Sequence, residues 1–285
     1  MLFDRRWGVW GQAYGGSNKT AGQTDAGSHD TTSHGYGFAT GADYRPSRDT
    51  LIGFALAGGN TSYGLSGGLG GGRSDVFQVG LYGSQQFGAA YLSAALSYAW
   101  HGTKTDRTVT VSGTDRLTAD FDAHSLGGRI ETGYRFATPV VGITPYAAFQ
   151  AQNYRMPSYT ETASSGSNAF ALGYSAQSTT TTRLELGAWF DKIIALNSSA
   201  VLAMRTRAAW VHDHSSNQSV NAVFQTLPGS GFTVNGAGTV PNSALLSAGA
   251  EIRLASGVSF SAKFDGEFAS RSQTYAGTGT ARYVW

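Results

Sequence analysis

Apolar and polar residues alternate along most of the chain with a period of two rather than 3.6. Leu126 and Ile130 fall on one face of their segment, and Arg129 falls on the other. A helix would mix these residues, whereas a β-strand separates them. The same separation recurs at 183–190 and 258–268, so the pattern predicts an all-β protein.

Twelve segments alternate in this way and are predicted to be strands. Many exceed the ~5–6 residues typical of globular strands, and a strand tilted across a bilayer needs ~9–11. The segments lie at 6–16, 32–45, 50–63, 73–87, 89–103, 119–137, 142–155, 181–191, 198–213, 243–254, 257–269 and 273–285.

The links between the segments alternate in length. Long polar links follow odd-numbered segments, at 17–31, 64–72, 104–118, 156–180 and 214–242; the short hairpin near Ser270–Ser272 is the exception. Short links follow even-numbered ones, at Pro46–Asp49, Phe87–Gly88, Thr138–Val141, Lys192–Asn197 and Ala255–Ser256. This sorting is typical of an outer-membrane barrel. We therefore predict a single twelve-stranded antiparallel transmembrane β-barrel, an up-and-down meander with extracellular loops and both termini in the periplasm.

The two faces of the strands differ in charge. The apolar face carries no charge at mid-strand and suits lipid, where a charge costs ~2–4 kcal/mol. A β-sandwich is the alternative, but it predicts shorter strands, more Asp and Lys, and no sorting of loops. We expect Asp43 and a charge network to face the lumen, formed by Arg129, Glu131, Arg183, Glu185, Arg205, Arg207, Glu251, Arg253, Lys263, Asp265 and Glu267.

Small residues occupy the opposite arc of the predicted lumen. Twelve strands lie between filled barrels of ~8 strands and open channels of ~16–18. A small wall leaves room for one helix or extended segment; alternatively, glycine relieves crowding and permits strand coiling. The small positions are Gly35, Gly37, Ala39 and Gly41, then Gly53, Ala55, Ala57 and Gly59, with Ser93, Ala95 and Ser97.

Aromatic residues gather near the predicted strand ends, as in the interfacial girdles of membrane barrels. Ordinary strand aromatics would produce a similar pattern. The residues are Trp7, Tyr14, Tyr44, Trp100, Tyr134, Trp210, Tyr283 and Trp285.

The composition narrows the function classes. Charged residues are 13% of the 285 residues, about half the usual ~25%. The net charge of +2 gives no case for nucleic-acid binding. The absence of cysteine excludes disulfides and thiolate metal sites. The first six residues hold no apolar signal core, so a protein working outside the cytoplasm would have lost an upstream segment.

Candidate chemistry is sparse. His212 and His214 share a face near a strand end and could hold a metal, but no third ligand is identifiable. The run 64–68 matches Gly-x-Ser-x-Gly, yet a Gly-rich loop follows it instead of the helix that a nucleophile elbow requires. Ser125 and His124 are adjacent and point to opposite faces. We expect no enzymatic activity, cofactor or metal.

Several segments resemble the C-terminal translocator domain of classical (type V secretion) autotransporters. The similarity covers nearly the whole chain, and its specificity lies in the order and spacing of short motifs. These are Trp7–Gly16, Gly37–Tyr44, Ile52–Gly58, Thr144–Ala148 with Tyr159–Glu161, Leu227–Gly236, Leu246–Gly249, Phe264–Phe268 and Ala281–Trp285.

The resemblance implies a pore-forming anchor that delivers an N-terminal passenger to the cell surface. It also implies that a helical linker preceding the first strand threads the lumen. Residues 1–5 would be a remnant of that linker, and 6–285 the translocator. No self-cleavage residue can be assigned. The partners would be outer-membrane lipid, the passenger with its linker, and the barrel assembly machinery; a monomer is expected. A free-standing small porin is the alternative.

The C-terminal segment has a physical interpretation of its own. Ala281, Tyr283 and Trp285 alternate outward and end on an aromatic residue. An unpaired last strand can join another sheet edge by β-augmentation. The resemblance implies that these residues form the signal that the assembly machinery reads, although any last barrel strand carries outward aromatics.

Overall fold

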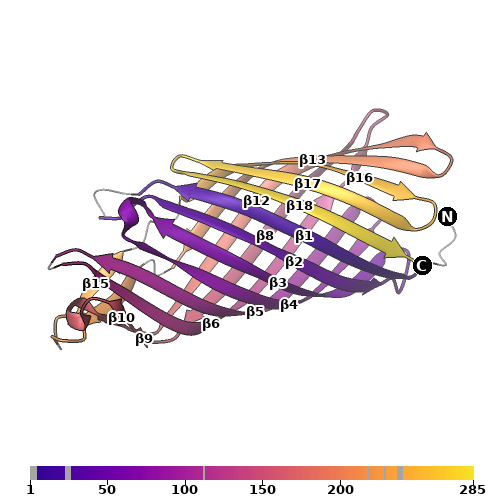
Figure 1. Cartoon of the computed structure of the whole chain (residues 1–285). Coiled ribbons are helices and arrows are strands. Elements are labelled where there is room, and N and C mark those ends of the chain that lie inside the picture. The colour runs from indigo at the N-terminus through magenta and orange to yellow at the C-terminus, as the bar shows by residue number, and fades with distance from the viewer. Residues whose placement is uncertain (1–4, 23–26, 112, 217–218, 228, 236–239) are drawn as a thin grey trace.

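The computed structural model describes the chain except residues 1–4, 23–26, 112, 217–218, 228 and 236–239. Within the described residues, twelve long antiparallel strands form one barrel (Figure 1). They are β1 (Trp7–Thr20), β2 (Thr31–Tyr44), β3 (Thr50–Leu65), β4 (Gly70–Phe87), β5 (Ala90–Val109), β6 (Asp115–Tyr134), β8 (Gly142–Met156), β12 (Gln177–Asn197), β13 (Ala200–Ser215), β16 (Asn242–Leu254), β17 (Val258–Ala269) and β18 (Ser272–Val284).

The barrel closes between its first and last strands. β1 pairs with β18 from Gly8↔Val284 to Thr20↔Ser272, and each other barrel strand pairs with its neighbours in chain order. The short β7 (Phe136–Ala137) lies in the link between β6 and β8, and those two strands pair directly. The predicted twelve-stranded up-and-down barrel is therefore confirmed.

The two ends of the barrel differ. The start of β1 and the end of β18 lie at one end of the barrel, opposite β9, β10 and β15 (Figure 1). We call the end with the start of β1 and the links 45–49, 88–89, 198–199 and 255–257 the turn end, and the opposite end the loop end. Helical segments among the described residues are the 3-10 turns η2 (Ser66–Gly68) and η3 (Asn168–Phe170). No helix in the described part of the chain is long and apolar enough to cross a membrane.

Strand boundaries differ from the prediction chiefly at the loop end. β5 and β6 continue to Val109 and Asp115, so the predicted loop 104–118 is mostly strand. The predicted turn Lys192–Asn197 is also strand, and the chain reverses at 198–199. Polar residues continue the β5–β6 ladder where these strands protrude into water, and composition does not mark that limit. In the second case the apolar residues Ile193, Ile194 and Ala195 continue the ladder through the predicted turn.

Two links predicted as loops contain a small sheet of their own. It has the order β15-β14-β11-β9, from β15 (Phe232–Asn235), β14 (Ser219–Phe224), β11 (Leu172–Tyr174) and β9 (Tyr159–Thr160). β10 (Thr162–Ser165) instead pairs with β6. The links 157–176 and 216–241 are thereby joined to each other, and we call this unit the loop sheet.

The outer face is apolar and the inner face holds the buried residues. Outward side chains such as Leu126, Ile130 and Phe260 are more than half exposed, while Glu185 on the inner face is 3% exposed. Tyr14 was predicted to lie in an aromatic girdle, and this is wrong. Its ring lies against Gly37 and Gly59 on the inner face. Its strand has glycines at 8, 11, 15 and 16, which hide the alternation.

Candidate functional site: the barrel lumen

Charged side chains converge inside the barrel because four strands carry them at alternate positions. Arg129 comes from β6, Glu185 from β12, Arg207 from β13 and Asp265 from β17. The register places Arg207 opposite Trp189 on one side and opposite Ser247 on the other. The part of the barrel wall from β6 through β8, β12, β13 and β16 to β17 thus carries a charged arc.

Glu185 is the centre of this arc. Its carboxylate accepts hydrogen bonds from both Arg129 terminal nitrogens, at 2.8 and 2.9 Å. Arg183 Nε donates at 3.1 Å and Arg207 Nη1 at 3.5 Å. The Tyr146 hydroxyl donates a further bond at 3.1 Å. A carboxylate buried to 3% exposure is stable only with such partners.

Each of these arginines also binds a second carboxylate. Arg183 reaches Glu267 at 2.6 Å and Asp213 at 3.1 Å. The remaining links are Arg129–Glu131 at 2.8 Å, Arg207–Asp265 at 3.0 Å and Lys263–Asp265 at 2.8 Å. Hydroxyls of Tyr91, Ser243 and Ser247 add bonds to the same carboxylates. We call these nine charged residues the Glu185 network.

Three predicted members lie outside the Glu185 network. Glu251 and Arg253 bind each other at 2.6 Å, and no ion pair among the described residues joins them to this network. Arg205 has no carboxylate within 4.0 Å among the described residues; its guanidinium lies 3.9 Å from the Trp189 ring centre. Asp213 belongs to the network but was not predicted. Asp213 lies on the same face of β13 as Arg205 and Arg207, so the alternation could have identified it, but the flanking histidines drew attention to a metal site instead.

A second polar chain lies inside the barrel near the turn end. The Trp10 indole N–H donates to the Tyr82 hydroxyl at 2.7 Å, and that hydroxyl donates to Asp43 at 3.2 Å. Arg282 forms a short ion pair with the same carboxylate, and Asp43 is buried. Asp43 was predicted to face inward, but Arg282 was not assigned.

Aromatic rings cover part of the small arc. A Cβ built on Gly37 would lie 2.4 Å from the Tyr14 hydroxyl, and one on Gly41 would lie 2.5 Å from the Trp10 ring. At Gly53 the nearest atom is Tyr82 Cζ, at 2.4 Å. Of the two interpretations of these glycines, relief of crowding applies at all three positions, because an aromatic ring occupies the space that a Cβ would fill.

Replacing Gly53 with alanine is expected to lower the free energy of unfolding by about 1–3 kcal/mol, as overpacking does. The added methyl group displaces the Tyr82 ring and breaks its bonds to Trp10 and Asp43. The measurement is the urea midpoint for loss of the folded band on unheated gels. Gly279→Ala is the control, since a Cβ there meets nothing within 4 Å. Equal midpoints for the two variants would contradict the prediction.

At the loop end, Glu161 joins the loop sheet to the barrel. Arg107 of β5 donates to its carboxylate at 2.9 and 2.5 Å and to the Phe170 carbonyl at 2.8 Å. The Leu172 amide and the Tyr174 hydroxyl also donate to it, at 3.0 and 3.3 Å. Glu161 is 5% exposed. This carboxylate therefore holds β9, β11, η3 and β5 together.

An aromatic stack adjoins this carboxylate. Phe121 of β6 stacks on Tyr159 at 4.2 Å between ring centres, and Tyr159 stacks on Tyr174 at 4.6 Å. Burial, and then the charge of Glu161, raises the pKa of Tyr174 from 10.0 to about 12. Burial likewise raises the pKa of Tyr159. Both phenols are thus neutral in the packed state at neutral pH.

The packing of the stack is expected to weaken between pH 10 and pH 12. The folded state holds the phenol proton more tightly than the unfolded state, so its stabilisation is complete below pH 10 and declines as pH rises to about 12. Near-ultraviolet circular dichroism reports the stack. Tyr174→Phe should shift the loss to higher pH. An unchanged midpoint would show that Tyr174 does not control it.

The other candidate residues carry no assembled chemistry. His212 Nδ1 lies 3.0 Å from Asn242 Oδ1, and the His212 ring stacks on Trp210. No group of three His, Cys, Asp or Glu side chains suited to a metal occurs in the described ranges. Ser66 begins the 3-10 turn η2, which is not the helix of a nucleophile elbow. Ser125 bonds His101, at 3.0 Å, rather than His124.

The predicted C-terminal signal lies on the outer face. Tyr283 and Trp285 are about half exposed and stack on each other at 5.5 Å. β18 pairs with β1 on one side and β17 on the other, so it offers no open edge in the closed barrel. Any β-augmentation through this strand would have to precede closure.

Comparison with known proteins identifies relatives of this barrel. The chain is 29% identical over 268 residues to an extracellular serine protease of Serratia marcescens, covering 93% of this chain and 24% of the relative. The chain therefore spans about a quarter of that protein's length.

Solved structures share the fold. The β domain of the Bordetella autotransporter BrkA superposes with a TM-score of 0.74 at 19% identity, covering 98% of this chain and 100% of the other. The translocator domain of NalP from Neisseria meningitidis gives a TM-score of 0.73 at 13% identity, covering 98% and 88%. The sequence profile of the family described as Autotransporter beta-domain matches residues 9–265. This chain belongs to the autotransporter β-domain family, whose barrels reside in the bacterial outer membrane.

Proposed function

We propose that this barrel is the outer-membrane translocator of a longer protein and delivers an N-terminal passenger to the cell surface. The family match over residues 9–265, on a closed twelve-stranded barrel, is the observation that carries the proposal. Residues 6–285 would form the translocator, and residues 1–5, mostly outside the described residues, would end the linker. The protease designation belongs to the whole Serratia protein, and we propose no enzymatic activity for the barrel.

The lumen has two arcs suited to different tasks in this proposal. The Glu185 network would stiffen one arc and fix the barrel's cross-section. The small positions on β2 and β3, with the Tyr14 and Trp10 rings, would border the threaded segment. Arg205, which has no ion pair among the described residues, would meet that segment as a charged contact.

Assembly would depend on the C-terminal residues before the barrel closes. Ala281, Tyr283 and Trp285 would be read by the barrel assembly machinery while β18 is unpaired. Surrounding lipid would then contact the apolar outer face, and the closed barrel would act as a monomer.

We further propose that the loop end is extracellular and the turn end periplasmic. The chain has no cysteine, so single introduced cysteines report orientation without background. In intact cells, a membrane-impermeant maleimide should label Ser165→Cys, in β10, and should not label Ser256→Cys, in the β16–β17 turn. Both positions are exposed, so both should react once the outer membrane is permeabilised. The reverse pattern would overturn this orientation.

The translocator proposal is tested on the full-length protein with an epitope tag inserted ahead of residue 5. Antibody should bind the tag on intact cells when the barrel migrates as a folded, heat-modifiable species. Purified barrel without its upstream region should be assayed for single-channel conductance in parallel. A folded barrel that conducts solutes but leaves the tag in the periplasm would overturn the proposal in favour of a porin.

A further inference from the structure

A shallow apolar groove runs along the outer face of the barrel where its first and last strands meet. We propose that this groove binds one acyl chain of an anionic phospholipid of the periplasmic leaflet, with Arg5 at the lipid phosphate. The inference rests on the proposed orientation of the turn end. It does not require passenger delivery.

The floor of the groove lacks side chains because three consecutive outward pairs are glycine and alanine. Gly11 lies opposite Ala281, and the next outward pairs are Ala13↔Gly279 and Gly15↔Gly277. A Cβ built on Gly277 or Gly279 would meet no atom within 4 Å. The seam is therefore a furrow in an outer surface that carries many large apolar side chains.

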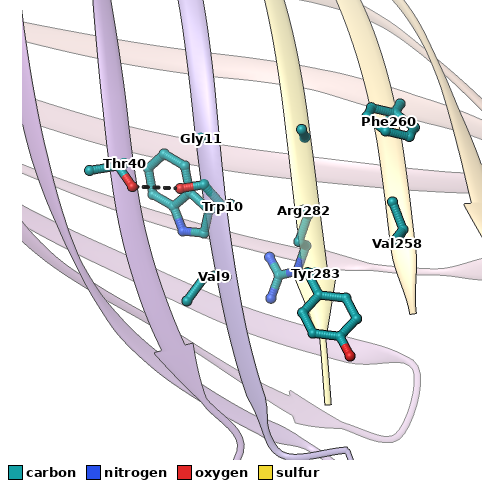
Figure 2. A pocket seen from close by; sticks show the side chains of 9 residues that line it. Val9, Trp10, Gly11, Thr40, Val258, Phe260, Arg282 and Tyr283 are labelled. Atoms are coloured by element: carbon teal, nitrogen blue, oxygen red, sulfur yellow. Dashed lines mark hydrogen bonds between the residues drawn. The ribbon is translucent and has the colours of Figure 1, made fainter. Parts of the chain in front are cut away.

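Larger side chains form the two walls. Figure 2 shows Thr40 on one side of Gly11 and Val258, Phe260 and Tyr283 on the other, with Val9 on the same strand as Gly11. The Thr40 hydroxyl donates to the Trp10 carbonyl at 2.9 Å, so it is satisfied within the protein (Figure 2). Further along the furrow the flanking aromatics are Tyr36, Phe38 and Phe264, opposite Gly15, Ala13 and Gly277.

The length of the furrow matches one leaflet. From Val9 to Gly15 the strand rises about 20 Å, at ~3.4 Å per residue. A strand tilted by ~45° converts this to a depth of about 14 Å. Half of a ~30 Å hydrocarbon core is ~15 Å. An acyl chain entering at the turn end would therefore reach close to the bilayer midplane.

Arg5 supplies a positive charge where the furrow reaches the turn end. Arg5 Nη2 donates to the Ala255 carbonyl at 2.9 Å, and Arg5 Nη1 lies 2.8 Å from a Cβ built on Gly257, next to the wall residue Val258. Among the described residues, no carboxylate forms a salt bridge with Arg5. Guanidinium binds phosphate oxygens well because its N–H donors are planar and paired.

The surroundings favour a negative headgroup over a neutral one. Arg6 and Arg45 lie on the same rim, where the Arg45 amide donates to the Arg6 carbonyl at 2.9 Å. A juxtamembrane Arg contributes about 1 kcal/mol of attraction to anionic lipid, a roughly fivefold preference. A protein strand is a poor occupant because β1 and β18 each pair on both sides. The occupant is therefore a lipid rather than an added strand.

Native mass spectrometry of the purified chain, delipidated in detergent, tests this directly. Dioleoyl phosphatidylglycerol and dioleoyl phosphatidylcholine are titrated separately. We expect one phosphatidylglycerol to bind about fivefold more tightly than phosphatidylcholine. Gly279→Leu, which fills the furrow, should abolish this bound lipid. Arg5→Gln should remove the preference for phosphatidylglycerol.

Matched variants identify the site. Ala248→Leu adds the same side chain to the outer face of β16, and Arg48→Gln removes an arginine from the β2–β3 turn; both should bind lipid like the parent. Equal affinity for the two lipids, full binding by Gly279→Leu, or displacement by inorganic phosphate would overturn the proposal. So would a dimer that Gly279→Leu dissociates. Because the tag assay measures display separately, failure here leaves the translocator proposal intact.

Discussion

Replacing Glu185 with glutamine is expected to lower the barrel's free energy of unfolding by about 3–5 kcal/mol, the usual cost of removing one partner from a buried ion pair. Arg129, Arg183 and Arg207 all converge on this carboxylate. Glutamine keeps the shape but removes the charge, so three guanidinium groups face one another with less compensation. The measurement is the urea midpoint for loss of the folded band in detergent, with the slope checked for constancy.

Glu251→Gln is the matched control for this substitution. Glu251 is also a lumen carboxylate, but among the described residues its salt bridge is to Arg253 alone, and its side chain is 27% exposed against 4% for Glu185. An exposed single pair contributes about 0–1 kcal/mol. Equal losses for the two variants would show that burial and multiple partners do not make Glu185 special. If Glu185→Gln fails to fold, Glu131→Gln, which removes a network carboxylate with one arginine partner, tests the same network more gently.

The strands and their faces were predictable because lipid and water impose opposite costs on charge. Successive side chains of a strand point alternately to lipid, which excludes charge, and to the lumen, which accepts it. This alternation alone places Arg129, Glu185 and Asp265 on the inner face. The same alternation places Arg282 and Asp213 on the inner face, so both could have been predicted from the sequence. Pairing partners were not predictable, since they depend on the stagger between strands that are distant in sequence.

The loop sheet and the position of the Tyr14 ring escaped prediction because both depend on contacts between distant segments. The loop sheet pairs β11 with β14, which are far apart in the chain and individually short. A three-residue strand has no periodicity of its own to detect. Tyr14 illustrates a second limit: its inward position follows from glycines on β2 and β3 that receive its ring, and β1 alone does not show this. Local alternation thus specifies the strands of the barrel wall, but it does not specify the contacts in the lumen or in the loop sheet.

Replacing Glu161 with glutamine is expected to release the loop sheet while leaving the barrel folded. The carboxylate accepts bonds from Arg107, the Leu172 amide and the Tyr174 hydroxyl. Losing its charge leaves the half-buried Arg107 without its ion-pair partner, at a cost of about 3 kcal/mol or a ~100-fold increase in local opening. Hydrogen exchange should therefore accelerate in residues 159–174 and 219–224, and not in β1 or β18.

The selectivity of that acceleration is the argument for a separate unit at the loop end. Asp120→Asn removes a carboxylate from the β5–β6 hairpin, which also carries Arg107. The ion pair of Asp120 with Lys104 is more than half exposed on both sides, so exchange should not change. The Gln225 side chain bonds the carbonyls of Glu161 and Leu172, at 2.7 and 3.0 Å. Opening must therefore reach the link 216–241 as well as 157–176. Acceleration confined to 157–176 would mean that the two links are ordered independently and that Glu161 anchors only one of them.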